Sequence, residues 1–147
     1  MSNNLIGNIV DWFKAAKPEP TGKDKVTQLA CVFEEVAELA EACGLEDLAE
    51  KLNDESYYLK KITPLHAERF LTGRNKVDIL DATSDITVTV QGLNQLMGFD
   101  GIGALKEVIR SNNSKMVDGK FIFDDNAKIA KPESFSEPNL KPFLGDK

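Results

Sequence analysis

Apolar residues recur at helical spacing through most of the chain. From about Asp24 to Gly44 they lie three or four positions apart, and Gly44 stands in the usual terminating position. This stretch is the clearest predicted helix. Its apolar positions are Leu29, Val32, Phe33, Val36, Leu39, Ala40 and Cys43. Glu34, Glu38 and Glu41 line the opposite side, which predicts a solvated face unless a partner covers them.

Similar patterns, separated by proline and glycine, predict further helices. A short helix runs from a cap at Asn3 or Asn4 to about Ala16, and KPEPTG ends it. Residues 45–62 predict a helix of mixed polarity, followed by a short helical piece at 65–73. Residues 102–116 predict another helix. After a turn at DGKFIF, the proline-containing end of the chain predicts an irregular tail.

The stretch 77–98 is ambiguous at first sight. Its ITVTV run alternates and is β-branched, as in a strand, but about 22 residues without proline exceed the usual strand length and favour a helix. Asp78, Asp81 and Asp85 follow one another at helical spacing here. Because the helix is apolar around most of its circumference after Asp85, we expect it to be central and its carboxylates to be partly buried.

These elements predict an all-α fold, namely an antiparallel helical bundle with a four-helix core, extra helices and an irregular C-terminal tail. The chain has 147 residues and 41% apolar content, which suits one globular domain spanning residues 1–147.

Composition narrows the class of partner. The net charge is −6, and the acidic excess lies before Gly101, which argues against a nucleic-acid partner because a phosphate backbone requires a basic face. The sequence has no basic leader and no apolar run of about 18 residues, so we expect a cytoplasmic protein without membrane contact. Cys31 and Cys43 occupy apolar helix positions without a metal-binding spacing, which predicts small buried thiols.

The acidic residues point to a hard metal ion. Several ionised carboxylates buried near one another are costly unless a cation compensates. Oxygen ligands without nearby His or Cys select Mg²⁺, with Mn²⁺ as the alternative. The single histidine, His66, lies in another segment, which excludes a di-iron bundle of the Glu-x-x-His type. Magnesium takes part of its coordination from substrate phosphates, so the implied substrate is a polyphosphate.

Three stretches resemble the all-α nucleoside triphosphate pyrophosphohydrolases, which include MazG-like enzymes, dimeric dUTPases and phosphoribosyl-ATP pyrophosphohydrolases. Glu34-Glu35-Val36-Ala37-Glu38 matches the family's first motif, and DATSDITVTVQG, with Asp85 as its terminal aspartate, resembles the second. The stretch EVIRSNNSKMVDGKFIFDDNAKIAKPESFSEPNL is similar to the C-terminal segment of phage and bacterial members. The resemblance covers roughly residues 5 to 143.

The resemblance implies Mg²⁺-dependent hydrolysis of a nucleoside triphosphate, a dNTP or a noncanonical NTP, between its α and β phosphates. It implies metal ligation by Glu35, Glu38, Asp81 and Asp85, and Glu34 or another non-ligating carboxylate as the acceptor of the water's proton. Relatives build such sites in a homodimer or a homotetramer, so the same assembly is expected here.

Two departures from the family pattern leave alternatives open. Ala82 stands where the family has a glutamate, so Asp81 or Asp78 must supply that ligand, and the spacing between the two motifs is longer than is common. Both departures keep one alternative open, namely a helical bundle that acts without catalysis as a nucleotide sensor or protein-binding module.

Basic and polar residues of the C-terminal half are candidates for nucleotide contacts. Arg110 and Lys115 are candidates for the phosphate tail, over which Lys128 and Lys131 would close, and Asn112 suits a base or sugar edge. For each lysine the alternative is a solvated surface charge. Aromatic residues that could stack on a base, but whose helical spacing also suits a core, are Trp12, Phe13 and Phe33.

Overall fold

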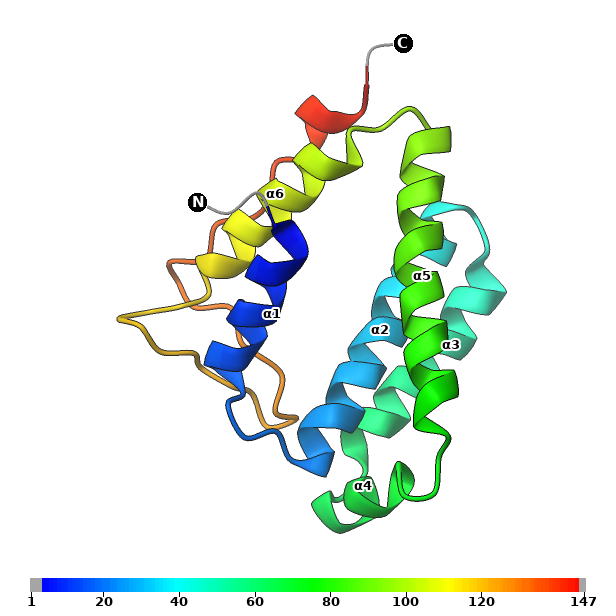
Figure 1. The fold of residues 1–147 in the computed structure, drawn as a ribbon, viewed down its shortest axis with the longest axis vertical. Coiled ribbons are helices and arrows are strands. Elements are labelled where there is room, and N and C mark those ends of the chain that lie inside the picture. Colours follow the sequence, from blue (N-terminus) through cyan, green and yellow to red (C-terminus); the bar gives the residue numbers. More distant parts are fainter. Residues whose placement is uncertain (1–3, 146–147) are drawn as a thin grey trace. The chain divides into compact units, whose positions relative to one another are not determined.

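The computed structural model describes residues 4–145, and within that range the chain is all-α (Figure 1). Two isolated bridges, Val117 with Lys120 and Phe123 with Ile129, are the extended pairings recorded there. The predicted fold class is therefore confirmed. The elements are α1 (Leu5–Ala16), α2 (Gly22–Ala42), α3 (Glu46–Lys61), α4 (Pro64–Phe70), α5 (Lys76–Leu96), α6 (Gly101–Asn113) and the 3₁₀ turn η1 (Lys141–Phe143).

The chain divides into two compact units. The hairpin unit comprises Lys17–Gly73 and Phe123–Ala130, and the tail unit comprises the residues up to Ala16, Arg74–Ile122 and the residues from Lys131 onward. Both units are built from segments that are distant in the sequence. The prediction of a single domain spanning residues 1–147 stays a prediction.

The hairpin unit is built on α2 and α3, which pack side by side along their lengths, with α4 against α2. Its main core consists of Val26, Ala30, Leu59 and Ala67, with Phe33 among the residues packed against it. A second cluster, farther along the hairpin, comprises Ala37, Ala40 and Ala49, with Leu52 against it.

Local signals determine where these helices begin and end. Thr21 and Asp24 form a reciprocal capping box, so α2 begins two residues before the predicted Asp24. Gly44, with φ of +76°, makes the turn into α3, as its predicted terminating position requires. The Thr63 hydroxyl accepts the His66 amide and caps α4, whose first turn holds Pro64.

The buried face of α2 differs from the predicted one. Val36 and Leu39 are exposed, as is Cys43, and Cys31 is only partly buried, so the expectation of two small buried thiols is wrong. Small side chains let two helix backbones approach closely, and alanines of α2 therefore face α3 in place of the larger residues. The buried residues of α2 are Gly22, Val26, Thr27, Ala30, Ala37 and Ala40.

In the tail unit, the irregular C-terminal tail packs along α6. Asp100 caps α6 by accepting the Gly103 amide, and its own amide donates to the Phe143 carbonyl at 2.9 Å. A Cβ at Gly103 would lie 2.6 Å from a Phe143 ring carbon, so glycine is needed for this close approach. Trp12 of α1 meets Phe121 edge to face, with ring centroids 5.1 Å apart.

Helix α5 is confirmed as a helix and is capped by Asn75, but its side chains are largely exposed. It has no buried residue, and Val77 and Leu96 are 74% and 89% exposed. The expectation of partly buried carboxylates is therefore wrong for the described chain, because Asp78, Asp81 and Asp85 are all exposed. Periodicity identified an apolar helix correctly, but it does not say whether the chain itself covers that helix.

None of the helices within residues 4–145 has the length and apolar character needed to cross a lipid bilayer.

Candidate functional site

Glu34, in the predicted first motif, pairs with two lysines. Its Oε2 receives Lys60 Nζ at 2.9 Å and Lys128 Nζ at 2.7 Å, and its side chain is 27% exposed. Glu35 and Glu38 lie on the same helix and are exposed. Glu34 is therefore partly covered and held by two lysines, whereas the side chains of Glu35 and Glu38 are exposed.

Lys60 reaches Glu34 from the last turn of α3, and neighbouring residues fix this end of the helix against α2. Leu59, its neighbour, is in the main core, and one turn earlier the buried Ser56 hydroxyl donates to the Ala30 carbonyl at 2.8 Å. The Lys23 ammonium of α2 donates to the carbonyls of Lys60 and Ile62, at 2.6 and 3.0 Å. A cation at these carbonyls suits the negative end of the helix dipole.

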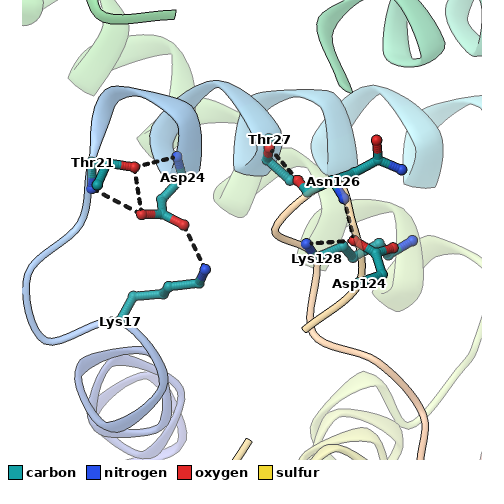
Figure 2. Close-up of polar contacts among 7 residues, drawn as sticks. All are labelled: Lys17, Thr21, Asp24, Thr27, Asp124, Asn126 and Lys128. Atoms are coloured by element: carbon teal, nitrogen blue, oxygen red, sulfur yellow. Dashed lines mark hydrogen bonds and ion pairs between the residues drawn. The ribbon is translucent and has the colours of Figure 1, made fainter. Parts of the chain in front are cut away.

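Lys128 reaches Glu34 from a loop, Phe123–Ala130, which we call the Lys128 loop. Asp124 Oδ1 accepts the amides of Asn126 and Lys128 at 2.8 and 3.0 Å, which folds the loop into a tight turn (Figure 2). Ala127 takes a left-handed φ of 64° in this turn. The Asn126 carbonyl in turn accepts the hydroxyl of the buried Thr27 at 2.9 Å.

The start of the Lys128 loop also meets the entry to α2. The Lys17 ammonium lies 3.8 Å from the ring centroid of Phe123. The same ammonium pairs with Asp24 (Figure 2). Burial acts to raise the pKa of Asp24, but hydrogen bonds from Lys17 and Thr21 outweigh it and lower the pKa. Lys17 therefore contacts both Asp24, which belongs to the capping box of α2, and Phe123, which begins the Lys128 loop.

The ion pairs control the charge state around Glu34. Partial burial acts to raise the pKa of Glu34, yet hydrogen bonds from Lys128 and Lys60 outweigh it and lower the pKa. For Lys128, burial acts to lower the pKa, and the Glu34 hydrogen bond reverses this and raises it. Nearby Cys31 has a pKa raised mainly by burial, which disfavours the reactive thiolate.

The predicted aspartates lie on α5 in the tail unit. Asp81 and Asp85 are one helical turn apart and exposed, and Asp78 precedes them on the same side. Ala82 projects no ligand between them. Asp81 and Asp85 are therefore spaced as a carboxylate pair on one helix, whereas the choice between Asp81 and Asp78 stays open.

Arg110 is already engaged with the tail. Its guanidinium donates two hydrogen bonds of 2.8 Å to Glu107, and it also reaches the Ser136 hydroxyl at 3.1 Å and the Glu137 carbonyl at 3.0 Å. The Asn139 amide donates to the same Glu107 at 2.9 Å. These bonds, led by those from Arg110, lower the pKa of Glu107 to about 2. The geometry assigns Arg110 a tail-anchoring role, and its phosphate role stays a prediction.

The other basic candidates are distributed over both units. Lys115, just after the end of α6, and Lys131 lie 5.6 and 4.8 Å from the ring centroid of Phe135 in the tail unit, whereas Lys128 belongs to the hairpin unit. Asn112, partly buried in the last turn of α6, gives its carbonyl to the Lys115 amide at 3.1 Å.

Two of the aromatic candidates have packing roles. Phe33 packs against the core of the hairpin unit, and Trp12 is enclosed edge to face by Phe13 and Phe121. The Trp12 indole N–H is buried without an acceptor.

No metal-binding group of three or more carboxylate, thiol or imidazole side chains occurs within either unit, as far as residues 4–145 are concerned. Two surface hollows of the hairpin unit have volumes of about 320 and 240 Å³. Neither is lined by a predicted site residue. The larger is lined by Glu41, Glu46, Ala49, Glu50, Asn53 and Asp54, and the smaller by Tyr58, Lys61, Ile62, Thr63 and His66.

Lys60 was not predicted from the sequence as a site residue. The sequence predicts a helix of mixed polarity at residues 45–62, and nothing in that pattern sets Lys60 apart from the other lysines of the segment. The available clue is spacing: Lys60 adjoins Leu59 and follows Ser56 by one turn, both of which turn toward α2.

Comparisons with protein-family models, with curated proteins and with solved structures give no match for this chain.

Proposed function

We propose that this chain is a Mg²⁺-dependent nucleoside triphosphate pyrophosphohydrolase, which releases pyrophosphate and a nucleoside monophosphate. The observation that carries the proposal is a pair of carboxylates at helical spacing on each of two helices, Glu35 with Glu38 on α2 and Asp81 with Asp85 on α5. Their order along the chain is that of the family motifs that they resemble.

The donor set fits the ion. All four side chains are exposed and offer carboxylate oxygens, which hard divalent cations prefer. When bound, Mg²⁺ supplies neutralisation of the phosphate oxygens. Mn²⁺, which takes the same ligands, is the expected substitute.

The remaining residues have separate roles in the proposal. Glu34, beside the ligand Glu35, is the carboxylate proposed to accept the proton of the attacking water. Lys115, Lys128 and Lys131 bind the phosphate tail. Arg110 contributes a fixed positive charge near that tail, and Asn112 contacts the base or sugar.

The proposal includes self-association into a homodimer or homotetramer. Large apolar side chains cover α5 and are exposed in the chain, and soluble proteins rarely leave such a surface uncovered. The exposed apolar residues of α5 are Val77, Ile79, Leu80, Ile86, Val88, Val90, Leu93 and Leu96. The substrate is a free nucleotide, since the net charge of −6 disfavours a nucleic-acid polymer.

A panel of common NTPs and dNTPs tests the function. Purified protein is incubated with each nucleotide, with and without Mg²⁺, and pyrophosphate is measured. We expect release with at least one nucleotide and only with the metal. Absence of turnover with all of them would contradict the proposal and favour the nucleotide sensor or protein-binding module, the alternative that Ala82 in the second motif leaves open.

A further inference from the structure

Two lysines neutralise one carboxylate in the hairpin unit, although one would be enough. Lys60 and Lys128 both place an ammonium group on Glu34 Oε2, at 2.9 and 2.7 Å. Two like charges at one oxygen repel each other, so the loss of either lysine relieves that repulsion and still leaves Glu34 paired. The question is which lysine leaves more easily.

Burial separates the two lysines. The side chain of Lys60 is 14% exposed and that of Lys128 is 41% exposed. A covered ammonium that loses its carboxylate stays poorly solvated, which is costly, whereas a half-exposed ammonium exchanges its partner for water. Glu34 therefore loses Lys128 at the smaller cost.

The supporting backbone reinforces this difference. Lys60 lies on a helix held by the Leu59 core contact, by Ser56 on the Ala30 carbonyl and by Lys23 at the end of the helix. The Lys128 loop, in contrast, is an irregular segment with a tight internal turn, and it is joined to α2 by the Lys128 ion pair and by the bond from Thr27 to Asn126. Loops held by few contacts open locally at low free-energy cost.

We propose that Lys60 is a positioning residue that holds the Glu34 carboxylate in place while Lys128 exchanges from Glu34 to an incoming phosphate group. The Lys128 loop then acts as a carrier of one ammonium group between two anions. The effect of this exchange on catalysis rests on the pyrophosphohydrolase function proposed above. The exchange of the ion pair itself requires only that a phosphate group binds.

Double-mutant cycles on the unfolding equilibrium test the exchange without any turnover. The variants are Glu34→Gln, Lys60→Met, Lys128→Met and the two doubles that contain Glu34→Gln, measured in urea with and without Mg²⁺ and inorganic pyrophosphate. We expect the coupling of Glu34 with Lys60 to persist in both conditions and the coupling with Lys128 to be lost when pyrophosphate and Mg²⁺ are present. Both couplings unchanged, or both lost, would overturn the proposal.

Kinetics test the positioning role. Lys60→Met is expected to lower kcat by about tenfold or more with KM little changed, and Lys60→Arg, which retains a cationic donor, to restore most of the loss. Lys128→Met should mainly raise KM. The exposed Lys51 on α3 supplies the matched control, since Lys51→Met removes a charge from the same helix and should leave both constants unchanged. Equal losses in Lys60→Met and Lys60→Arg would contradict the positioning role.

The two proposals fail in different ways. If no nucleotide is hydrolysed but the Lys128 coupling is lost with pyrophosphate, the enzymatic function is wrong and the exchange stands. If nucleotides are hydrolysed and both couplings stay unchanged, the function stands and the exchange is wrong.

Discussion

The hydroxyl of Thr27 donates a hydrogen bond of 2.9 Å to the carbonyl of Asn126, which joins α2 to the Lys128 loop across 99 positions of sequence. Thr27 is 3% exposed, so its hydroxyl forms this hydrogen bond inside the hairpin unit rather than with solvent. This hydrogen bond and the ion pair of Lys128 with Glu34 together hold the loop against α2, the helix that carries the first motif.

Thr27→Val is expected to loosen the Lys128 loop. Valine has nearly the same shape as threonine, and the carbonyl of the partly exposed Asn126 can accept a hydrogen bond from water instead. The free energy of unfolding should therefore fall by about 1 kcal/mol. Amide hydrogen exchange of residues 123–130 should become faster. Thr89→Val on α5 is the control, because the Thr89 hydroxyl bonds the Asp85 carbonyl of its own helix. Unchanged exchange in Thr27→Val would show that the loop is held by other contacts.

Glu38→Gln is expected to abolish turnover without changing the fold. The substitution removes one ligand charge where charge neutralisation is worth several kcal/mol, so kcat should fall by about a hundredfold or more. Glu38 is exposed, so the thermal midpoint should hardly move. The matched control is Glu41→Gln, one turn farther along α2 and outside the proposed ligand set. Similar activity in both variants would show that the ligand assignment is wrong.

Mg²⁺ is expected to stabilise the protein against heat. A ligand that binds only the folded state adds about 2.7 kcal/mol at a concentration of about 100 times its Kd. A thermal melt with Mg²⁺, compared with one in NaCl of equal ionic strength, should therefore show a higher midpoint. Asp85→Asn should remove most of the increase, and an equal increase in that variant would place the ion elsewhere.

Acid is expected to release the tail from α6. The pKa of Glu107 is lowered from 4.5 to about 2, chiefly by Arg110 and then by the Asn139 amide. Because the folded pKa is the lower one, the stabilisation is fully present above about pH 4.5 and is lost as the pH falls through about 2. The NMR signal of the Asn139 amide should report this change, with a midpoint near the lower value.

Glu107→Gln provides the control for the acid titration. The neutral amide cannot pair with Arg110 as an anion, so the Asn139 signal should lie near its released position at every pH. A midpoint near 4.5 in the unmodified protein would contradict the geometry of this contact.

Substitution on α5 is expected to weaken self-association. Leu80 is 68% exposed, and Leu80→Glu would place a charge in an interface that covers this helix. Since an unpaired buried charge is costly, association should weaken by at least about tenfold, as measured by sedimentation. Leu65→Glu, at a similarly exposed leucine of α4, is the control. An unmodified chain that sediments as a monomer would contradict the proposed assembly.

The helices were predictable because their signals are local. A glycine at residue 44 and helical periodicity act within a few residues and do not depend on distant contacts. The packing face of α2 was not predictable in the same way. The helix offers several apolar stripes, and only the position of α3 selects the one containing Ala30 and Ala37.

The candidate site shows the same limit. The glutamates of the first motif stand close together in the sequence, so their arrangement on one helix followed directly from helical geometry. The partners of Glu34 did not, because Lys128 lies 94 positions away and its neutralising role depends on the folded loop. Arg110 was predicted as a candidate for the phosphate tail. Its bond to Ser136 could not be predicted, because it depends on the path of the C-terminal tail along α6.

The sequence by itself determined the all-α class, the approximate limits of most helices and the grouping of acidic residues on α2 and α5, since each depends on neighbours within one or two turns. Only the tertiary structure decided which apolar face is covered, that α5 is exposed in the chain, and that Glu34 is held between a partly buried helix lysine and a loop lysine. These outcomes depend on which distant segments meet, and the free energy of such contacts is set by burial and charge rather than by local spacing.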